Sequence, residues 1–407
     1  MRRGLVATLV LVVGAGGLTL VHASGPEDPL VVHEWGTFTS MQGSDGCSLE
    51  GLQHEEEALP RFVYDRSRIR QCPLRGQGYK GLEVPVEHVT QKMETPVIYF
   101  HTKTPRRVRV HVDFVEGLLT QWYPVSDLLG PKEGSRTDGP LDVAKVDRSF
   151  LEWDVDLLPE GKGAIAHPPE VPANDPWSIA REVSSALVQT VPRAEPRNGP
   201  TEAERYIFYR GLGRFTLPVE VRDGAFVNGT KHEIPAAIAV RVKPDGSGEF
   251  SDLGAIAPGG SVRPERWKQC PDAGCLKTGL GWTVRMKLVA QGLDADEALA
   301  MVKTWSRSWF ASEGTRILYI VPRECTDAIL PLTITPAPEK LVRVLVGRLE
   351  YLTPETEAEV EAAIKAKDTA RLARLGRFLE PNVRRIAAKT GDEAVKRNAA
   401  ELLETVR

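Results

Sequence analysis

The sequence predicts an α+β protein, mainly antiparallel β and sandwich-like, with an amphipathic helix and a C-terminal helical segment. Three observations predict this class. Short segments that alternate apolar and polar residues recur between residues 31 and 252. Turn-forming runs such as Asn228-Gly229 and Pro244-Asp245-Gly246 separate them. After Gln291 the apolar residues recur at helical spacing instead.

Residues 1–23 have the pattern of an export signal. Arg2 and Arg3 precede an uncharged stretch from Leu5 to Val21, and small residues follow at the positions that signal peptidase reads, which predicts cleavage after Ala23. The alternative is an uncleaved anchor, because the stretch is at the lower edge of the length that spans a bilayer. We therefore expect a periplasmic or secreted protein with no transmembrane span after signal cleavage.

The first expected strand runs from Val31 to Ser40, with His33, Trp35 and Thr37 on one face and Glu34 and Phe38 on the other. Residues 96–101 and 107–114 predict a hairpin, which would leave Tyr99, His101, Arg109 and His111 on an outer face suited to a glycan or a partner protein. Further strands are expected at these ranges: 150–158, 205–209, several between 217 and 252, 316–321 and 340–349.

Helices are expected in three places. One begins at Asp175-Pro176 and continues through Leu187, within a proline-rich excursion at about 159–200. A second begins at the capping box formed by Asp294 and Glu297. Its stripe, which includes Trp305 and Trp309, is expected to be core, with a ligand pocket as the alternative. Three more fill the C-terminal segment: 355–367, 369–379 and 393–406. The expected organisation is a β-rich domain at 24–350 and a helical segment at 351–407.

Composition excludes few functions. The 407 residues carry a formal net charge of −3 with both signs interspersed, which does not favour nucleic acid as a partner. The Gly-x-Ser-x-Gly, His-Glu-x-x-His and phosphate-loop signatures are absent from the sequence. No complete catalytic motif is present, so the chain is not identified as an enzyme.

The five cysteines fit an oxidising compartment. Cys47 with Cys72 and Cys270 with Cys275 are predicted disulfides. A half zinc site is the alternative, but the sequence offers no second cysteine pair to complete it. Cys325 is expected to be a buried thiol.

The densest group of possible metal ligands is His33-Glu34 together with His54 and the acidic run Glu55–Glu57. Imidazole and carboxylate are ligands that suit zinc and other divalent metals. Adjacent strand residues point to opposite faces, so His33 and Glu34 are not expected to share one metal. No cofactor is predicted outright; a divalent metal held by His33, His54 and Glu55 is one hypothesis, and a solvated acidic loop is the other.

A second set of residues is proposed to bind a ligand. It comprises His33, Trp35, Lys92, Glu94, Tyr209 and Arg210. Lys92 and Glu94 are either an acid–base pair or a surface ion pair. Gly211-Leu212-Gly213 is read as a turn and not as half of a dinucleotide fingerprint.

Several runs resemble an uncharacterised family of exported bacterial proteins. They are Val32-His33-Glu34-Trp35-Gly36-Thr37-Phe38-Thr39, Lys92-Met93-Glu94-Thr95-Pro96-Val97 and Phe208-Tyr209-Arg210-Gly211-Leu212-Gly213. The resemblance covers most of the chain after residue 23. It implies a common fold and export, and it implies no activity.

These observations favour an exported soluble protein that acts as a binding or interaction module of the cell envelope, with an envelope ligand or protein of unknown identity as its partner. One alternative is a metal-dependent hydrolase centred on His33 and the acidic loop Glu55–Glu57. Another is a structural component of the envelope.

Overall fold

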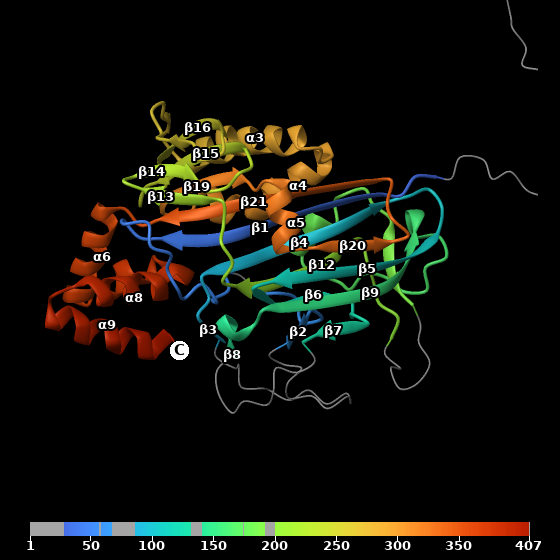
Figure 1. Cartoon of the computed structure of the whole chain (residues 1–407), viewed down its shortest axis with the longest axis horizontal. Coiled ribbons are helices and arrows are strands. Elements are labelled where there is room, and N and C mark those ends of the chain that lie inside the picture. The colour runs from blue at the N-terminus through green and yellow to red at the C-terminus, as the bar shows by residue number, and fades with distance from the viewer. Residues whose placement is uncertain are drawn as a thin grey trace, which may run out of the picture.

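The structure is a computed structural model that describes residues 28–56, 58–66, 86–131, 141–173, 175–191 and 200–406. It is an α+β fold of mostly antiparallel sheets, as the sequence predicts, and long strands run along the length of the molecule (Figure 1). The predicted export signal lies outside the described residues. None of the helices in the described part of the chain is long and apolar enough to cross a membrane.

The larger sheet has ten strands. In spatial order they are β18 (Lys268–Cys270), β16 (Gly248–Ile256), β15 (Ile234–Val242), β19 (Gly314–Ile320), β21 (Lys340–Tyr351), β1 (Val31–Gln42), β4 (Gln91–His101), β12 (Ile207–Gly213), β6 (Gly117–Tyr123) and β2 (Tyr64–Asp65). The pairs are antiparallel except β1 with β21, which run parallel over their whole length. This parallel pair was not expected from the sequence.

The second sheet packs against one face of the first. Its strands are β11 (Ala203–Glu204), β10 (Leu187–Thr190), β9 (Arg148–Leu158), β5 (Arg106–Val115) and β20 (Leu332–Thr335), with β7 (Leu128–Gly130) also paired to β9. Smaller sheets are formed by β13 (Val219–Arg222), β14 (Ala225–Asn228) and β17 (Ser261–Val262), and by β3 (Val86–Glu87) and β8 (Leu141–Asp142).

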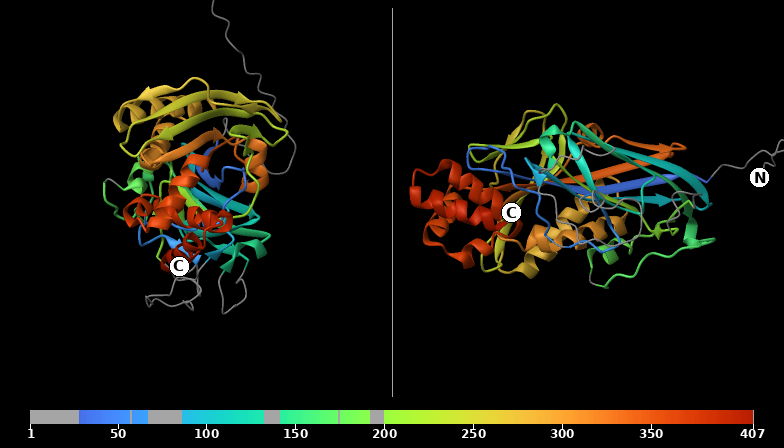
Figure 2. Two further views of the ribbon diagram at one scale, coloured as in Figure 1. Left: turned by 90° about the vertical axis from the view of Figure 1, so that its left-hand side faces the viewer. Right: turned by 90° about the horizontal axis from the view of Figure 1, so that it is seen from below.

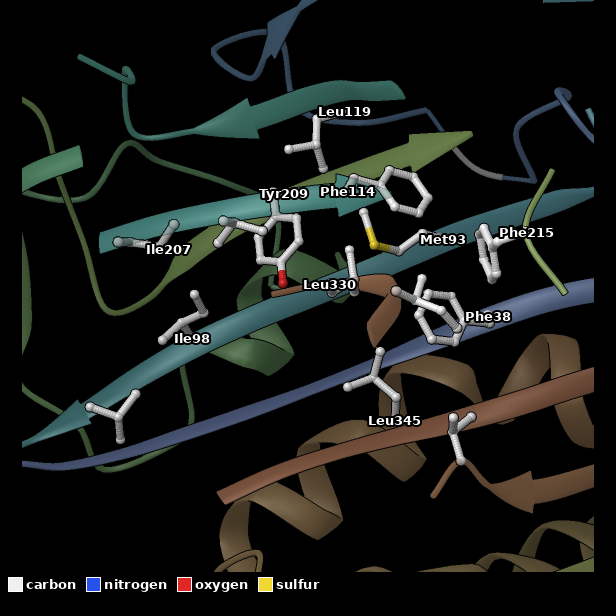
Figure 3. Close-up of a cluster of buried hydrophobic side chains, with 14 of the residues drawn as sticks. Phe38, Met93, Ile98, Phe114, Leu119, Ile207, Tyr209, Phe215, Leu330 and Leu345 are labelled. Carbon is white, nitrogen blue, oxygen red and sulfur yellow. The ribbon is translucent and has the colours of Figure 1, made fainter. Parts of the chain in front are cut away.

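The core between the two larger sheets is mostly apolar. Phe38, Met93 and Leu345 from the larger sheet pack there with Phe114 from β5 (Figure 3). The alternation predicted for the first strand is confirmed, because Phe38 faces this core while Trp35 faces the opposite one.

The predicted hairpin between residues 96–101 and 107–114 is wrong. Both segments are strands, but β4 pairs with β1 and β12 while β5 pairs with β9 and β20. The chain passes from one sheet to the other between them, so Phe100 and Val108 enter the same core from opposite layers. Tyr99 is consequently buried, and its hydroxyl donates to the Ala180 carbonyl at 2.8 Å.

Helices cover the other face of the ten-stranded sheet. They are α2 (Pro176–Ala180), α3 (Ala273–Ala290) and α4 (Ala295–Phe310) (Figure 2). They bury a second core that contains Trp35, Met301 and Trp309. The capping box of Asp294 and Glu297 is confirmed, as is burial of the α4 stripe. Helix α2 starts at the predicted Asp175 cap but ends at Ala180, and Leu187 belongs to β10.

The C-terminal helices lie at one end of the molecule (Figures 1 and 2). They are α6 (Pro354–Ala366), α7 (Thr369–Ala373), α8 (Leu379–Lys389) and α9 (Glu393–Val406), and they share a small core of their own. Helix α5 (Arg323–Ile329) lies between β19 and β20, and short 3-10 turns occur at η1 (Val143–Lys145), η2 (Pro159–Gly161) and η3 (Gly376–Phe378). Helices α3, α5 and α8 were not expected from the sequence.

Candidate functional site

A single row of charged side chains and one threonine crosses the helix-covered face of the ten-stranded sheet, and we call this row the polar band. Its members are Arg316 on β19, Arg348 and Glu350 on β21, Thr39 on β1, Lys92 and Glu94 on β4, and Arg210 on β12. None of these side chains is more than 8% exposed. Burial of so many charges requires that each be paired.

Strand register brings the band together. Arg316 is opposite Glu350, Arg348 is beside Thr39, and Thr39 is opposite Lys92. Because side chains alternate along a strand, the residues next to these point into the apolar core on the other face, as Met93 does. Polar residues on five neighbouring strands therefore occupy one continuous line.

A β-bulge shapes the band at β4. Trp35 pairs with Val97 and Thr37 with Glu94, so two residues of β4 stand opposite Gly36. Thr95 has a φ of 50°, in the left-handed region that is unusual for threonine. A Cβ at Gly36 would lie 2.9 Å from the Cα of Pro96, so a larger residue there would push the bulge out. The bulge lets Glu94 and Thr95 line the same cavity.

Ion pairs hold the centre of the band. Arg377, from η3, donates to Glu94 at 2.5 Å, and Thr39 Oγ1 donates to the same carboxylate at 2.6 Å. Burial would raise the pKa of Glu94, but the charges of Arg377 and Lys92 hold it well below its ordinary value. Glu94 is therefore ionised at neutral pH, although it is buried.

The acidic loop closes over the band. Glu55 lies 2.9 Å from the Lys92 ammonium and also accepts from Arg210, and Glu56 lies 3.4 Å from Arg377. Both loop side chains remain about one-third exposed, at 36% and 35%. Burial lowers the pKa of Lys92, which the neighbouring carboxylates Glu55 and Glu94 partly offset.

Positive charge exceeds negative charge in this cluster. The cations are Lys92, Arg210, Arg316, Arg348 and Arg377, whereas the buried carboxylates are Glu94 and Glu350. The loop adds Glu55 and Glu56, which makes four carboxylates. Among the described residues, the five cations of this cluster therefore outnumber its carboxylates by one. Several buried guanidinium nitrogens have no hydrogen-bond partner in the part of the chain that the structure describes: Arg210 Nε, Arg348 Nη2, Arg377 Nε and Arg377 Nη2.

A cavity that is partly open to solvent lies between the acidic loop, α2 and α4. Its charged lining is Glu55, Glu56, Glu94, Asp175, Arg210 and Arg307, and its aromatic lining is Trp177, Tyr206, Phe208 and Trp305. Apolar surface with a few convergent polar groups is typical of sites for small organic ligands.

The aromatic wall is fixed by its own contacts. Trp177 Nε1 donates to Glu204 at 2.7 Å, and the Tyr206 hydroxyl donates to the Trp177 carbonyl at 3.1 Å. The rings of Trp177 and Phe208 lie 4.8 Å apart between centroids, and those of Trp305 and Trp309 stack at 5.9 Å. The wall is therefore preformed.

The structure brings together part of the predicted binding set. Lys92, Glu94 and Arg210 lie in the polar band, and both members of the Lys92/Glu94 pair are buried, so neither is a surface ion pair. Trp35 does not reach the cavity, because it is fully buried in the core under α4.

Tyr209 is also outside the cavity. It lies on the opposite face of β12 in the inter-sheet core (Figure 3). Its hydroxyl donates to Glu34. Glu34 in turn accepts from Arg343, which places a buried charged pair against this core. Tyr209 is thus a structural residue.

The predicted metal ligands His33, His54 and Glu55 are not brought together. His54 Nε2 lies 2.6 Å from Glu380 on α8, and Glu55 pairs with Lys92. His33 Nδ1 lies 2.7 Å from Glu297 at the start of α4. Among the described residues, the group spaced to hold a metal ion is His33, His101, Asp294 and Glu297.

The cysteines stand as free thiols where they are described. Cys47 is exposed, and its predicted partner Cys72 lies outside the described residues. Burial and the neighbouring Cys275 raise the pKa of Cys270 to about 12. Cys325 is half-buried, and burial raises its pKa. Both disulfides stay predictions.

Sequence reasoning missed several members of the site. Arg348, Glu350 and Arg377 were not singled out, nor were Trp177 and Phe208. A sequence signal was present for two of them, since Arg348 and Glu350, two positions apart, interrupt the apolar run that follows Arg343. The contribution of Arg377 depends on how the C-terminal helices dock, and no local pattern predicts that.

No protein-family model matches the chain, and no curated protein matches it. Among solved structures, weak similarity is found to the zebrafish (Danio rerio) Fcho1 mu homology domain with bound Eps15 peptide, at 5% identity and a TM-score of 0.25 over 80% of this chain and 95% of that one. The yeast delta-COP-I mu-homology domain complexed with the Dsl1 WxWxV peptide is similar at 6% identity and 0.22, over 80% and 98%. Likeness at this level assigns neither a family nor a ligand.

Proposed function

We propose that this protein is a ligand-binding module, and that its cavity takes a small organic anion with an aromatic or branched apolar body. The observation that carries the proposal is the excess of buried cations in the polar band and its partner Arg377, a cluster that reaches the cavity at Arg210. Uncompensated buried charge costs several kcal/mol, so an anionic group that approaches Arg210 is favoured there.

The loop carboxylates support the same ligand chemistry. Glu55 and Glu56 already present carboxylate oxygens to Lys92, Arg210 and Arg377. Arginine guanidinium groups are well suited to carboxylate, since they offer several N–H donors in one plane. Arg210 lines the cavity, and its Nε, which has no hydrogen-bond partner among the described residues, remains to donate to a ligand.

The aromatic wall accounts for the rest of the ligand. The aromatic side chains of Trp177, Phe208 and Trp305 line the same cavity as Arg210. An aromatic or branched apolar group would bury its surface there at about 25 cal/mol per Å². A ligand with one acidic end and one apolar end therefore matches both parts of the cavity.

Ligand binding is tested with arylalkanoic acids as probes. Phenylacetate, phenylpropionate and indole acetate are expected to raise the melting temperature and to quench tryptophan fluorescence, because Trp177 and Trp305 line the cavity. Phenethylamine and phenylacetamide, which lack the carboxylate, are expected to bind more weakly. Glu56→Gln, which removes a competing carboxylate, is expected to tighten acid binding severalfold.

A filled cavity provides the control. Ala58 is exposed on the loop and lines the cavity, so Ala58→Trp should abolish binding without loss of fold. Ala257→Trp places the same residue at an exposed position elsewhere and should bind like the wild type. Failure of every acid to bind, preference for the amine, or unchanged binding by Ala58→Trp would each overturn the proposal.

We also propose that this module acts in the cell envelope or outside the cell. The proposal rests on the signal-like residues 1–23. Mass analysis of protein recovered from the periplasm or medium should give a mature chain that starts at Ser24. Recovery of uncleaved protein from the cytoplasm alone would contradict it.

A further inference from the structure

Two histidines and two carboxylates meet at the first turn of α4, away from the ligand cavity. His33 comes from β1, His101 from β4, and Asp294 and Glu297 from the start of α4. One ligand atom from each residue lies within 4.8 Å of the others. Trp305, which lines the cavity, is eight residues further along α4 from Glu297, or about 12 Å at 1.5 Å per residue.

We propose that these four residues bind a divalent transition metal of the Zn²⁺ class. The proposal is independent of the organic-anion cavity. Imidazole nitrogen combined with carboxylate oxygen is a ligand set that zinc accepts readily. Four protein ligands without an obligatory open position are typical of a structural metal rather than a catalytic one.

The backbone presents both histidines to the same point. His33 is opposite Tyr99 in the register of β1 and β4, so His101 is its diagonal neighbour on the face that carries α4. Their ring centroids are 5.0 Å apart, with the rings inclined at 61°. Each imidazole can therefore reach Glu297 without a change of strand geometry.

The capping box fixes the carboxylates. Asp294 is the N-cap residue of α4, and the Glu297 side chain turns back to accept the Asp294 main-chain N–H at 2.8 Å. His33 Nδ1 lies 2.7 Å from Glu297 Oε2, and His101 Nε2 lies 3.1 Å from Glu297 Oε1. Ligand atoms at bond lengths of about 2.0 Å around a tetrahedral zinc are roughly 3.3 Å apart. The separations within the group, from 2.7 Å to at most 4.8 Å, lie on both sides of that value, so small side-chain rotations would bring the four ligand atoms to one metal.

Burial and charge favour a cation at this point. The Glu297 side chain is 0% exposed, and in the described part of the chain no lysine or arginine forms an ion pair with it or with Asp294. His33 is 1% exposed, and its Nε2 has no hydrogen-bond partner among the described residues. A divalent cation would neutralise both carboxylates.

The site is accessible to an ion and would have a clear structural effect. Asp294 is exposed and His101 is about one-quarter exposed, at 24%, so the metal can enter from solvent on that side. Once bound, it would tie the start of α4 to β1 and β4. This link would hold the helix layer against the ten-stranded sheet.

Metal titration of the untagged full chain tests the site. Cobalt(II), which replaces zinc and absorbs visible light, should bind in about one equivalent with the spectrum of a nitrogen- and oxygen-ligated ion. Zinc should compete with the cobalt and raise the melting temperature, and a chelator should reverse that rise. His101→Gln and Asp294→Asn change residues at the accessible side and should each lose the stoichiometric cobalt signal while they remain folded.

His111 offers a matched control. It also lies beside two carboxylates, with Nδ1 3.1 Å from Glu152 and Nε2 3.5 Å from Asp113, but it is not part of the four-residue group. His111→Gln should bind cobalt like the wild type. The absence of stoichiometric binding by the wild type, or an unchanged cobalt spectrum in folded His101→Gln and Asp294→Asn, would overturn the assignment and leave a hydrogen-bonded histidine–carboxylate cluster.

Discussion

The ammonium of Lys92 lies 2.9 Å from the carboxylate of Glu55, although Lys92 is buried on a central strand and Glu55 belongs to a surface loop. The pair joins the loop to the polar band at its centre. Because the band carries more cations than the sheet supplies carboxylates, the position of the loop and the charge balance of the sheet depend on each other.

Neutral loop residues should weaken the fold. The double variant Glu55→Gln/Glu56→Gln removes both loop charges, and we expect it to lower the free energy of unfolding by about 1–3 kcal/mol at neutral pH. This is less than for a fully buried pair, since both side chains are about one-third exposed. Urea unfolding followed by tryptophan fluorescence measures the change. Glu160→Gln, at an exposed pair with Lys162, is the control and should differ little from the wild type.

Arg377→Met should leave the buried Glu94 carboxylate without its strongest partner. Loss of one member of a buried ion pair costs about 3–5 kcal/mol, and we expect a loss of that order at pH 7. Arg374→Met removes a half-exposed arginine from the same segment and should cost less than about 1 kcal/mol. Equal effects of the two variants in urea unfolding would show that Arg377 does not neutralise Glu94.

The same variant should change the response to acid. In the wild type the pKa of Glu94 is lowered by Arg377, so its contribution to stability is complete above the ordinary value of 4.5 and is lost as the pH falls below it. Without Arg377 the folded pKa rises, and less stability is lost in acid. The difference in free energy of unfolding between wild type and Arg377→Met should therefore narrow between pH 6 and pH 4. A difference that stays constant or widens would contradict the assigned pair.

Tyr209→Phe should separate a structural role from a ligand-binding role. It removes the hydroxyl that donates to buried Glu34, and we expect a loss of about 1–2 kcal/mol in the free energy of unfolding. The affinity for an aryl carboxylate should not change, because Tyr209 lies on the opposite face of β12 from the cavity. Weaker binding of the aryl carboxylate by the folded variant would show that Tyr209 contributes to ligand binding.

Gly36→Ala tests the bulge in β4. Its new methyl would lie 2.9 Å from the Pro96 backbone, so we expect a loss of about 1–3 kcal/mol together with weaker ligand binding, since the bulge positions Glu94 and Thr95. Gly391→Ala is the control, because a Cβ there meets nothing within 4 Å. Melting temperature and probe affinity, measured on both variants, check the two effects.

Local patterns in the sequence predicted the elements better than their partners. Alternation assigned the faces of β1 correctly, and the Asp294–Glu297 capping box marked the start of α4, because both depend on residues a few positions apart. The hairpin prediction was wrong, since the alternating segments 96–101 and 107–114 bury their apolar faces equally well in two facing sheets. Helix α8 was not predicted; it contains Pro381 in its first turn, where proline is tolerated.

The candidate sites show the same limit. Lys92, Glu94 and Arg210 were selected from runs around two strands, and the structure places them together. His33 was predicted as a metal ligand, but the residues with which it groups, His101 and Glu297, are 68 and 264 positions away along the chain. Only strand register and helix docking determine which carboxylate it meets.

The parallel pairing of β1 with β21 bears on how the chain folds. The first described strand forms its longest pairing with a strand that begins more than 300 residues later. Glu94 and its partner Arg377 are likewise 283 residues apart in the sequence. Contacts between residues so far apart in the sequence require a large loop to close, and the loss of chain entropy precedes any stabilisation by the contact. The centre of the large sheet therefore closes only after nearly the whole chain is present, and until then β1 exposes an unpaired edge on which an incomplete chain is prone to aggregate.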